Sequence, residues 1–151
     1  MPTNILRNRN KPATGAQAAK TGRKPAPRRI LITAGRASLR AELLDTPTAD
    51  RIWNALPIHS SAETWGRSVK FETPIESGRE RNARQLVTLG DICFVVEDDR
   101  VIIVFGPTPI SRPGELRLPR PCNLFARALD DVGVLNAVRP GEKVSLTPAQ
   151  D

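Results

Sequence analysis

The sequence predicts a mainly β fold, a closed antiparallel barrel of about eight strands with one or two short helices. Two continuous apolar runs, Ile92–Val96 and Val101–Phe105, are separated by four polar residues, which is the pattern of a hairpin with a short loop. Several other segments alternate apolar and polar residues, as half-buried strands do. Turn residues recur between these short segments, and this spacing is typical of β-barrels.

The barrel is expected to begin with a hairpin and a helix. Residues 30–33 are apolar or β-branched and are followed by a turn pair, after which residues 37–43 alternate as a second strand. Thr46 is a good N-cap, and Pro47 suits the first position of a helix. Apolar residues then follow at helical spacing until Pro57, which ends the helix.

The middle of the chain alternates between connections and strands. Residues 59–66 are expected to form a loop, and residues 68–75 alternate as a strand. A charged connection leads to a short extended piece at residues 86–89, before the apolar hairpin. Because both runs of that hairpin are apolar at every position, both faces should be covered, one by the barrel interior and the other by the helix or a partner. Residues 106–121 are rich in Pro and Gly and are expected to be a long, shaped loop.

The last part of the chain should complete the barrel. Residues 123–129 form a further strand, residues 131–138 a short helix, and residues 143–147 a closing strand after the turn Pro140-Gly141.

Charge divides the chain into two parts. The net charge is +7, yet residues 1–29 hold eight basic residues and no acid, whereas residues 30–151 hold 15 basic and 16 acidic residues. We therefore expect a disordered basic tail over residues 1–29 and a nearly neutral barrel domain over residues 30–151. The tail fits neither a secretory signal nor a mitochondrial presequence. It is expected to be solvated, with weak non-specific contact to nucleic acid phosphates as the alternative.

Several classes of function are disfavoured by composition. The longest apolar runs have five residues, so no membrane span is expected, and we expect a cytoplasmic location. Two cysteines are too few for a disulfide scaffold or a zinc site, and a single histidine, His59, argues against most metal chemistry. We predict no metal and no cofactor. Cys93 should be an inert core residue, whereas Cys122, between Pro121 and Asn123, is expected to be exposed.

A set of short motifs runs through the body in a fixed order. They are Trp65-Gly66, Phe71-Glu72-Thr73-Pro74, Leu89-Gly90-Asp91-Ile92, Val104-Phe105-Gly106-Pro107-Thr108-Pro109, Ser111, Asn123 and Arg139-Pro140-Gly141-Glu142-Lys143-Val144. In this order the body resembles the small, single-domain cyclophilin-like proteins of bacteria and archaea, whose function is largely uncharacterised. The resemblance covers roughly residues 30–147. It implies a closed cyclophilin-type barrel with a small helix at each end.

The resemblance does not carry prolyl isomerase residues with it. True cyclophilins place an Arg beside a Phe-His pair and add a Phe-x-Met-Gln strand, and this sequence contains neither pattern. No catalytic residue is assigned, and isomerase activity is kept as an alternative that the sequence disfavours. The favoured interpretation is a non-catalytic binding module for a peptide or small ligand. Its expected contacts are Trp65, Phe105 and Thr108, with Arg112 as the partner of an anion or carbonyl group.

Overall fold

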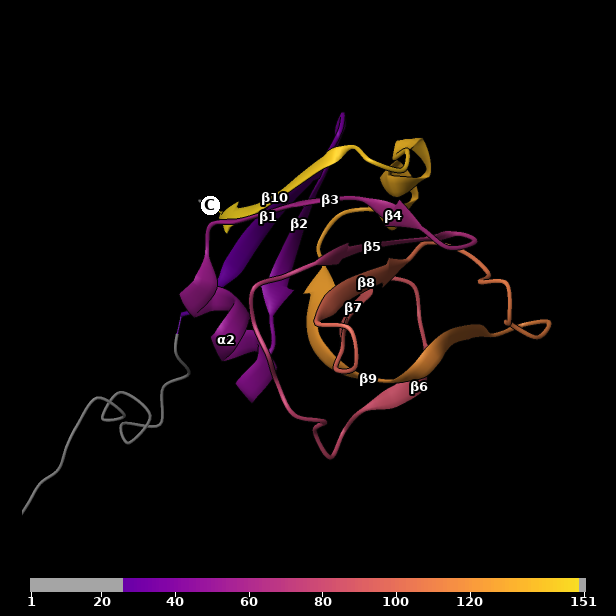
Figure 1. Cartoon of the computed structure of the whole chain (residues 1–151), viewed down its shortest axis with the longest axis horizontal. Coiled ribbons are helices and arrows are strands. Elements are labelled where there is room, and N and C mark those ends of the chain that lie inside the picture. The colour runs from indigo at the N-terminus through magenta and orange to yellow at the C-terminus, as the bar shows by residue number, and fades with distance from the viewer. Residues whose placement is uncertain (1–25, 150–151) are drawn as a thin grey trace, which may run out of the picture.

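A nearly closed antiparallel barrel of nine strands forms the body of the protein in the computed structural model, which describes residues 26–149 (Figure 1). The strands are hydrogen-bonded in the order β3-β10-β1-β2-β9-β7-β8-β5-β4, and β6 pairs with β9 off this path. Their bounds are β1 Arg29–Ala34, β2 Ala37–Leu43, β3 Ile58–Ser61, β4 Glu63–Thr64, β5 Ser68–Glu72, β6 Arg84–Val87, β7 Asp91–Val95, β8 Arg100–Val104, β9 Leu116–Ala128 and β10 Lys143–Pro148. The predicted fold class is confirmed.

One segment of chain brings the two ends of this strand path together. β3 pairs with β10 at one end of the path, and β4 pairs with β5 at the other. β3 and β4 are separated only by Ala62, which is 3% exposed. The prediction of a loop over residues 59–66 is therefore wrong. The strand pattern is hard to recognise in the sequence because only Ile58 and Ala62 of this segment are buried apolar residues, and the three residues between them are polar.

Two short helices flank the barrel, close to where the sequence predicts them. Helix α2 (Pro47–Ala55) is capped by Thr46, whose hydroxyl accepts a 3.1 Å hydrogen bond from the backbone of Ala49. Its buried face, with Ile52 at its centre, joins the barrel core. The second is a 3-10 helix, η1 (Val132–Ala137), which turns its two buried residues onto the same core. These helices are too short to be stable alone, so this packing holds them.

The β7–β8 hairpin separates two apolar clusters. Alternate residues of its strands face the barrel core, among them Phe94, which is fully buried. The others face a second cluster, made of Val87, Cys93, Val95, Ile102, Val104, Leu118, Cys122 and Leu124. Coverage of both faces was predicted, but the second face is covered by β6 and the first half of β9, and not by the helix. Figure 1 shows β9 forming an arc around β7 and β8.

Strand β9 begins at Leu116, so the predicted loop over residues 106–121 is too long by several residues. Pro119 and Pro121 obscured the strand in the sequence, because proline lacks the amide that a central strand needs. Their part of β9 pairs only with β6, and that ladder shifts its register there. The prediction that Cys122 is exposed is also wrong, because this residue of β9 is 0% exposed and packs in the second cluster.

The predicted basic tail lies mostly outside the described residues, which begin at Ala26. Its last two basic residues belong to the barrel. Arg29 begins β1 and pairs with Glu42 of β2, and Arg28 pairs with Asp50 of α2. Over residues 26–149, no helix is both long and apolar enough to cross a bilayer.

Candidate functional site

The two most distinctive sequence motifs form one structural unit. The Trp65-Gly66 turn lies against the loop that follows β8, because Arg67 donates its amide to Pro107 O (3.1 Å) and accepts from the amide of Phe105 (2.9 Å). Gly66 has a φ of +58°, and a Cβ there would come within 2.5 Å of Pro109 Cδ. Only glycine suits both the left-handed backbone and the close approach. The motifs therefore meet to build a shaped loop at one end of β8.

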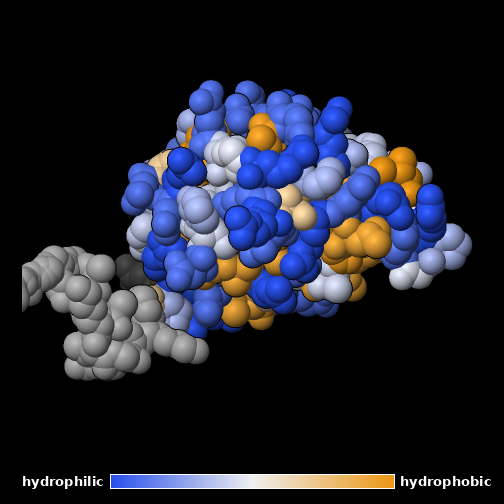
Figure 2. All heavy atoms as spheres, turned by 90° about the horizontal axis from the view of Figure 1, so that it is seen from below, coloured by the Kyte–Doolittle hydropathy of each residue, from blue (hydrophilic) through white to orange (hydrophobic). Residues whose placement is uncertain are grey.

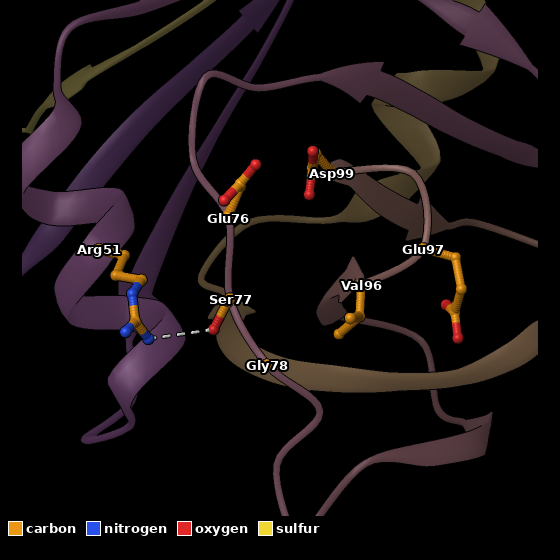
Figure 3. A pocket seen from close by; sticks show the side chains of 7 residues that line it. All are labelled: Arg51, Glu76, Ser77, Gly78, Val96, Glu97 and Asp99. Atoms are coloured by element: carbon orange, nitrogen blue, oxygen red, sulfur yellow. Dashed lines mark hydrogen bonds between the residues drawn. The ribbon is translucent and has the colours of Figure 1, made fainter.

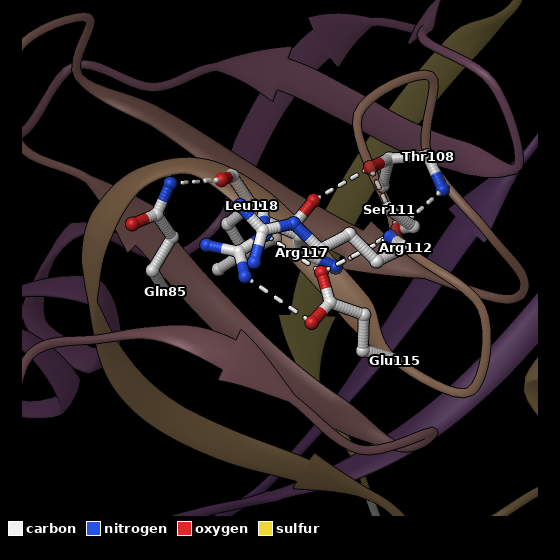
Figure 4. Close-up of polar contacts among 7 residues, drawn as sticks. All are labelled: Gln85, Thr108, Ser111, Arg112, Glu115, Arg117 and Leu118. Atoms are coloured by element: carbon white, nitrogen blue, oxygen red, sulfur yellow. Dashed lines mark hydrogen bonds and ion pairs between the residues drawn. The ribbon is translucent and has the colours of Figure 1, made fainter.

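The loop is held from within by a polar network (Figure 4). Thr108 donates from its hydroxyl to the backbone oxygen of Arg117 at 2.6 Å, and the Ser111 hydroxyl accepts from the amides of Thr108 and Arg117 at 3.0 and 2.9 Å. Glu115 accepts two hydrogen bonds from the Arg117 guanidinium, at 2.6 and 3.2 Å, and one from the amide of Arg112 at 3.0 Å. These bonds fix the loop to the start of β9.

The same network sets the charge state of Glu115. The hydrogen bonds from the Arg117 guanidinium, followed by the amide of Arg112, lower the pKa of the Glu115 carboxyl below its ordinary value. Glu115 is therefore ionised at neutral pH, and its charge is compensated by Arg117.

A groove of about 430 Å³ is lined by residues of this loop and the start of β9. We call it the loop groove, and its lining residues are Pro107, Ser111, Arg112, Pro113, Gly114, Glu115 and Leu116. The prolines and Leu116 give it apolar surface, and Leu116 also packs against the second cluster. The side chain of Arg112 is exposed and forms no hydrogen bond or ion pair within the described part of the chain, although its charge contributes to lowering the pKa of nearby Glu115. Its positive charge is available to a ligand.

The four predicted contact residues occupy different places around this groove. Arg112 lines it, whereas Thr108 is 5% exposed and has its hydroxyl engaged inside the loop. Trp65 is half-buried against the second cluster, with Lys70 Nζ 6.0 Å from its ring centre. Phe105 is half-buried against the barrel core, under the guanidinium of Arg67 at 5.5 Å.

Sequence reasoning named Arg112 but missed Glu115 and Leu116, which also line the groove. The signal that could have found them is the alternation of Leu116 and Leu118, which marks the start of β9. Glu115 lies immediately before that strand, two residues from Arg117, with which it pairs.

A second groove, of about 570 Å³, lies between α2 and the turn of the β7–β8 hairpin (Figure 3). We call it the acidic groove, because Glu76, Glu97 and Asp99 line it together with Arg51. Arg51 donates to the Ser77 hydroxyl at 3.3 Å. Glu97 is held in an ion pair with Arg79, which ties the 73–83 connection to the hairpin. The Glu97-Asp98-Asp99 turn lies at a hairpin tip, as the sequence predicts.

A buried amide fixes the 73–83 connection beside this groove. Asn123 is 0% exposed; its side chain donates to Gly78 O at 2.8 Å and to the Thr48 hydroxyl at 3.0 Å, and accepts from the amide of Glu80 at 2.9 Å. The Thr48 hydroxyl in turn donates to the carboxylate of Glu80 at 2.6 Å. The residues of this cluster are mutually satisfied, which indicates a role in holding α2, the connection and β9 together.

Neither cysteine is placed for reaction. Burial raises the pKa of the Cys93 thiol, with further effects from nearby Cys122 and Asp91. Burial also raises the pKa of the Cys122 thiol to about 12. Both therefore stay protonated at neutral pH. Among residues 26–149, no group of three or more His, Cys, Asp or Glu side chains is arranged to hold a metal ion.

Apolar side chains are scattered over the surface of the molecule. The face seen from below is mostly hydrophilic, with separate hydrophobic patches (Figure 2). The exposed large apolar side chains of the described residues are Leu86, Leu89, Ile110, Leu129 and Val134. Because such side chains are ordinary when scattered, the loop groove, which combines concavity with a free charge, is the better candidate site.

The barrel and its motifs define the class of protein. A family described as Cyclophilin-like matches residues 28–147. The chain belongs to this family. No curated protein matches it.

Two solved structures are similar to this chain. The hypothetical protein AF2241 from Archaeoglobus fulgidus, solved in solution, superposes with a TM-score of 0.72 at 30% identity, over 85% of this chain and 99% of that one. The structure of McbB in complex with tryptophan superposes with a TM-score of 0.61 at 14% identity, over 81% of this chain and 45% of that one. The second likeness shows the fold alone.

Proposed function

We propose that this protein is a non-catalytic, cytoplasmic binding module that takes a peptide or small ligand carrying a carboxylate in the loop groove. The observation that carries the proposal is the charge of Arg112. Glu115, the other charged side chain of the groove, forms its ion pair with Arg117. The Arg112 guanidinium is exposed beside apolar surface and forms no hydrogen bond or ion pair within the described residues. A planar guanidinium recognises a carboxylate by two parallel hydrogen bonds.

The rest of the groove supports an apolar group next to that carboxylate. Pro107, Pro113 and Leu116 offer apolar surface, and a loop fixed by prolines loses little freedom when a ligand binds. In this proposal Trp65 and Phe105 support the loop from the two clusters, and Thr108 preserves its shape. A short peptide with an apolar last residue and a free carboxyl end has the matching chemistry.

The test is a titration of the isotope-labelled full chain with two forms of the tripeptide Ala-Ala-Leu, one with a free carboxyl end and one amidated. We expect the free form to shift the amide signals of residues 111–116, and the amidated form to bind about tenfold more weakly, as the loss of roughly 1.5 kcal/mol for a charge-assisted hydrogen bond implies. Arg112→Ala should remove this preference. The matched control is Arg120→Ala, an exposed arginine of β9 outside the groove.

Two results would contradict the proposal. Equal binding of the two peptide forms would show that Arg112 does not recognise the carboxylate. Chemical-shift changes confined to residues outside the loop would show that the peptide does not bind in the loop groove. A proline-peptide assay on the same variants addresses the isomerase alternative. Turnover by the wild-type chain that disappears in Arg112→Ala would show that the protein is an enzyme and not a passive module.

A further inference from the structure

A third groove lies where the described chain enters the barrel. It measures about 930 Å³, which is more than either groove above, and we call it the entry groove. Its apolar lining comes from the exposed Ala26 and Pro27 and the half-buried Leu44, whereas Leu43, at the end of β2, is only 6% exposed. Leu44 also packs against the second cluster, so this apolar surface rests on fixed structure.

The rim of the entry groove is acidic and already holds basic side chains. Asp50 forms a 2.9 Å ion pair with Arg28, and Glu42 forms a 3.3 Å ion pair with Arg29. Asp45 is exposed and has no ion pair or hydrogen bond to another residue of the 26–149 range. The rim therefore binds Arg28 and Arg29, and the carboxylate of Asp45 can still pair with another basic side chain.

The sequence before Ala26 has the complementary composition. Residues 1–25 contain six basic residues and no acidic one, and their only branched aliphatic residues are the adjacent pair Ile5-Leu6, followed by Arg7 and Arg9. The sixteen residues between Arg9 and Ala26 can span on the order of 50 Å when extended, so the pair can reach back to the groove.

We propose that residues 5–9 of this chain dock in its own entry groove. Ile5 and Leu6 would cover the exposed Pro27 and the half-buried Leu44, which removes apolar surface on both sides of the contact from water. The following arginines would lie at the acidic rim, where Asp45 is open. This contact is independent of the loop groove and of any ligand bound there.

The test uses paramagnetic broadening in the full chain. A nitroxide attached at Thr3→Cys labels the tail alone, because both native cysteines are buried. We expect the oxidised label to remove most of the intensity of the amide signals of residues 43–45, and to leave β5 and β8 unchanged. Even broadening over the whole barrel, or none, would overturn the proposal.

Two further samples make the result specific. Adding Ile5→Asp and Leu6→Asp should abolish the broadening, whereas Ala13→Asp and Thr14→Asp, which add the same charge elsewhere in the tail, should preserve most of it. An equal loss in both would mean that net charge alone holds the tail, against the proposal. Mixing spin-labelled, unenriched chains with isotope-labelled chains should give no broadening, and broadening there would assign the groove to the tail of a second copy.

Discussion

Replacing the buried amide of Asn123 should destabilise the whole domain. Asn123→Ala removes three hydrogen bonds, of 2.8, 3.0 and 2.9 Å, to the 73–83 connection and α2. At about 1 kcal/mol net for each bond, we expect a loss of about 3 kcal/mol in the free energy of unfolding, which lowers the urea midpoint. For a domain of this size that corresponds to a fall of roughly 10 °C in Tm.

The assay is urea unfolding followed by tryptophan fluorescence, with Asn136→Ala as the control. Asn136 is exposed on η1, and a surface substitution of this kind should change stability by less than about 0.5 kcal/mol. Thr48→Val tests the shared network, because the double variant should lose less than the sum of the two single losses. If Asn123→Ala unfolds within about 0.5 kcal/mol of the wild type, the amide does not hold this connection, and the reasoning fails.

Three further outcomes are expected. Both cysteines should resist a thiol reagent in the folded chain and react fully in urea, and reaction of the folded chain would contradict their burial. Gly66→Ala should destabilise the fold measurably, because Gly66 has a φ of +58° and an added Cβ would approach Pro109 too closely. Gly78→Ala should not, because an added Cβ there meets open space, and equal urea midpoints for the two variants would refute the steric reasoning. Hydrogen bonds from Arg40 lower the pKa of Asp130, so this carboxylate stabilises the fold above its unfolded pKa of about 3.9 and loses that effect as the pH falls through its lower folded pKa. The urea midpoints of wild type and Asp130→Asn should therefore converge in acid. A gap between the two midpoints that stays constant with pH would contradict this role of Asp130.

Much of the barrel could be predicted from local pattern. The β1–β2 hairpin, the helix after Thr46 and the β7–β8 hairpin each show a strong periodicity or a capping residue, and the structure confirms them. The β3–β4 segment could not be predicted in this way, because its pairing partners are distant in the sequence and its outward residues are polar. Closure of a barrel is a long-range property, whereas periodicity reports only on the nearest neighbours.

The candidate site was predicted less completely, for a different physical reason. The sequence places Arg112 in a long loop, and the structure brings it to a groove. The sequence does not indicate that Thr108 turns inward or that Glu115 is paired with Arg117, because both contacts depend on how the loop folds back onto β9. Side-chain direction in a loop rich in proline follows from tertiary hydrogen bonds and not from spacing.

The course of β9 has a consequence for how the protein comes apart. Phe125 and Ala126 of this strand belong to the barrel core, and Leu118 and Cys122 to the second cluster, while the β7–β8 hairpin contributes to both. Neither cluster can open without exposing strands that the other requires. We therefore expect one cooperative unfolding unit, in which the central amides of β9 exchange with solvent only when the whole domain unfolds.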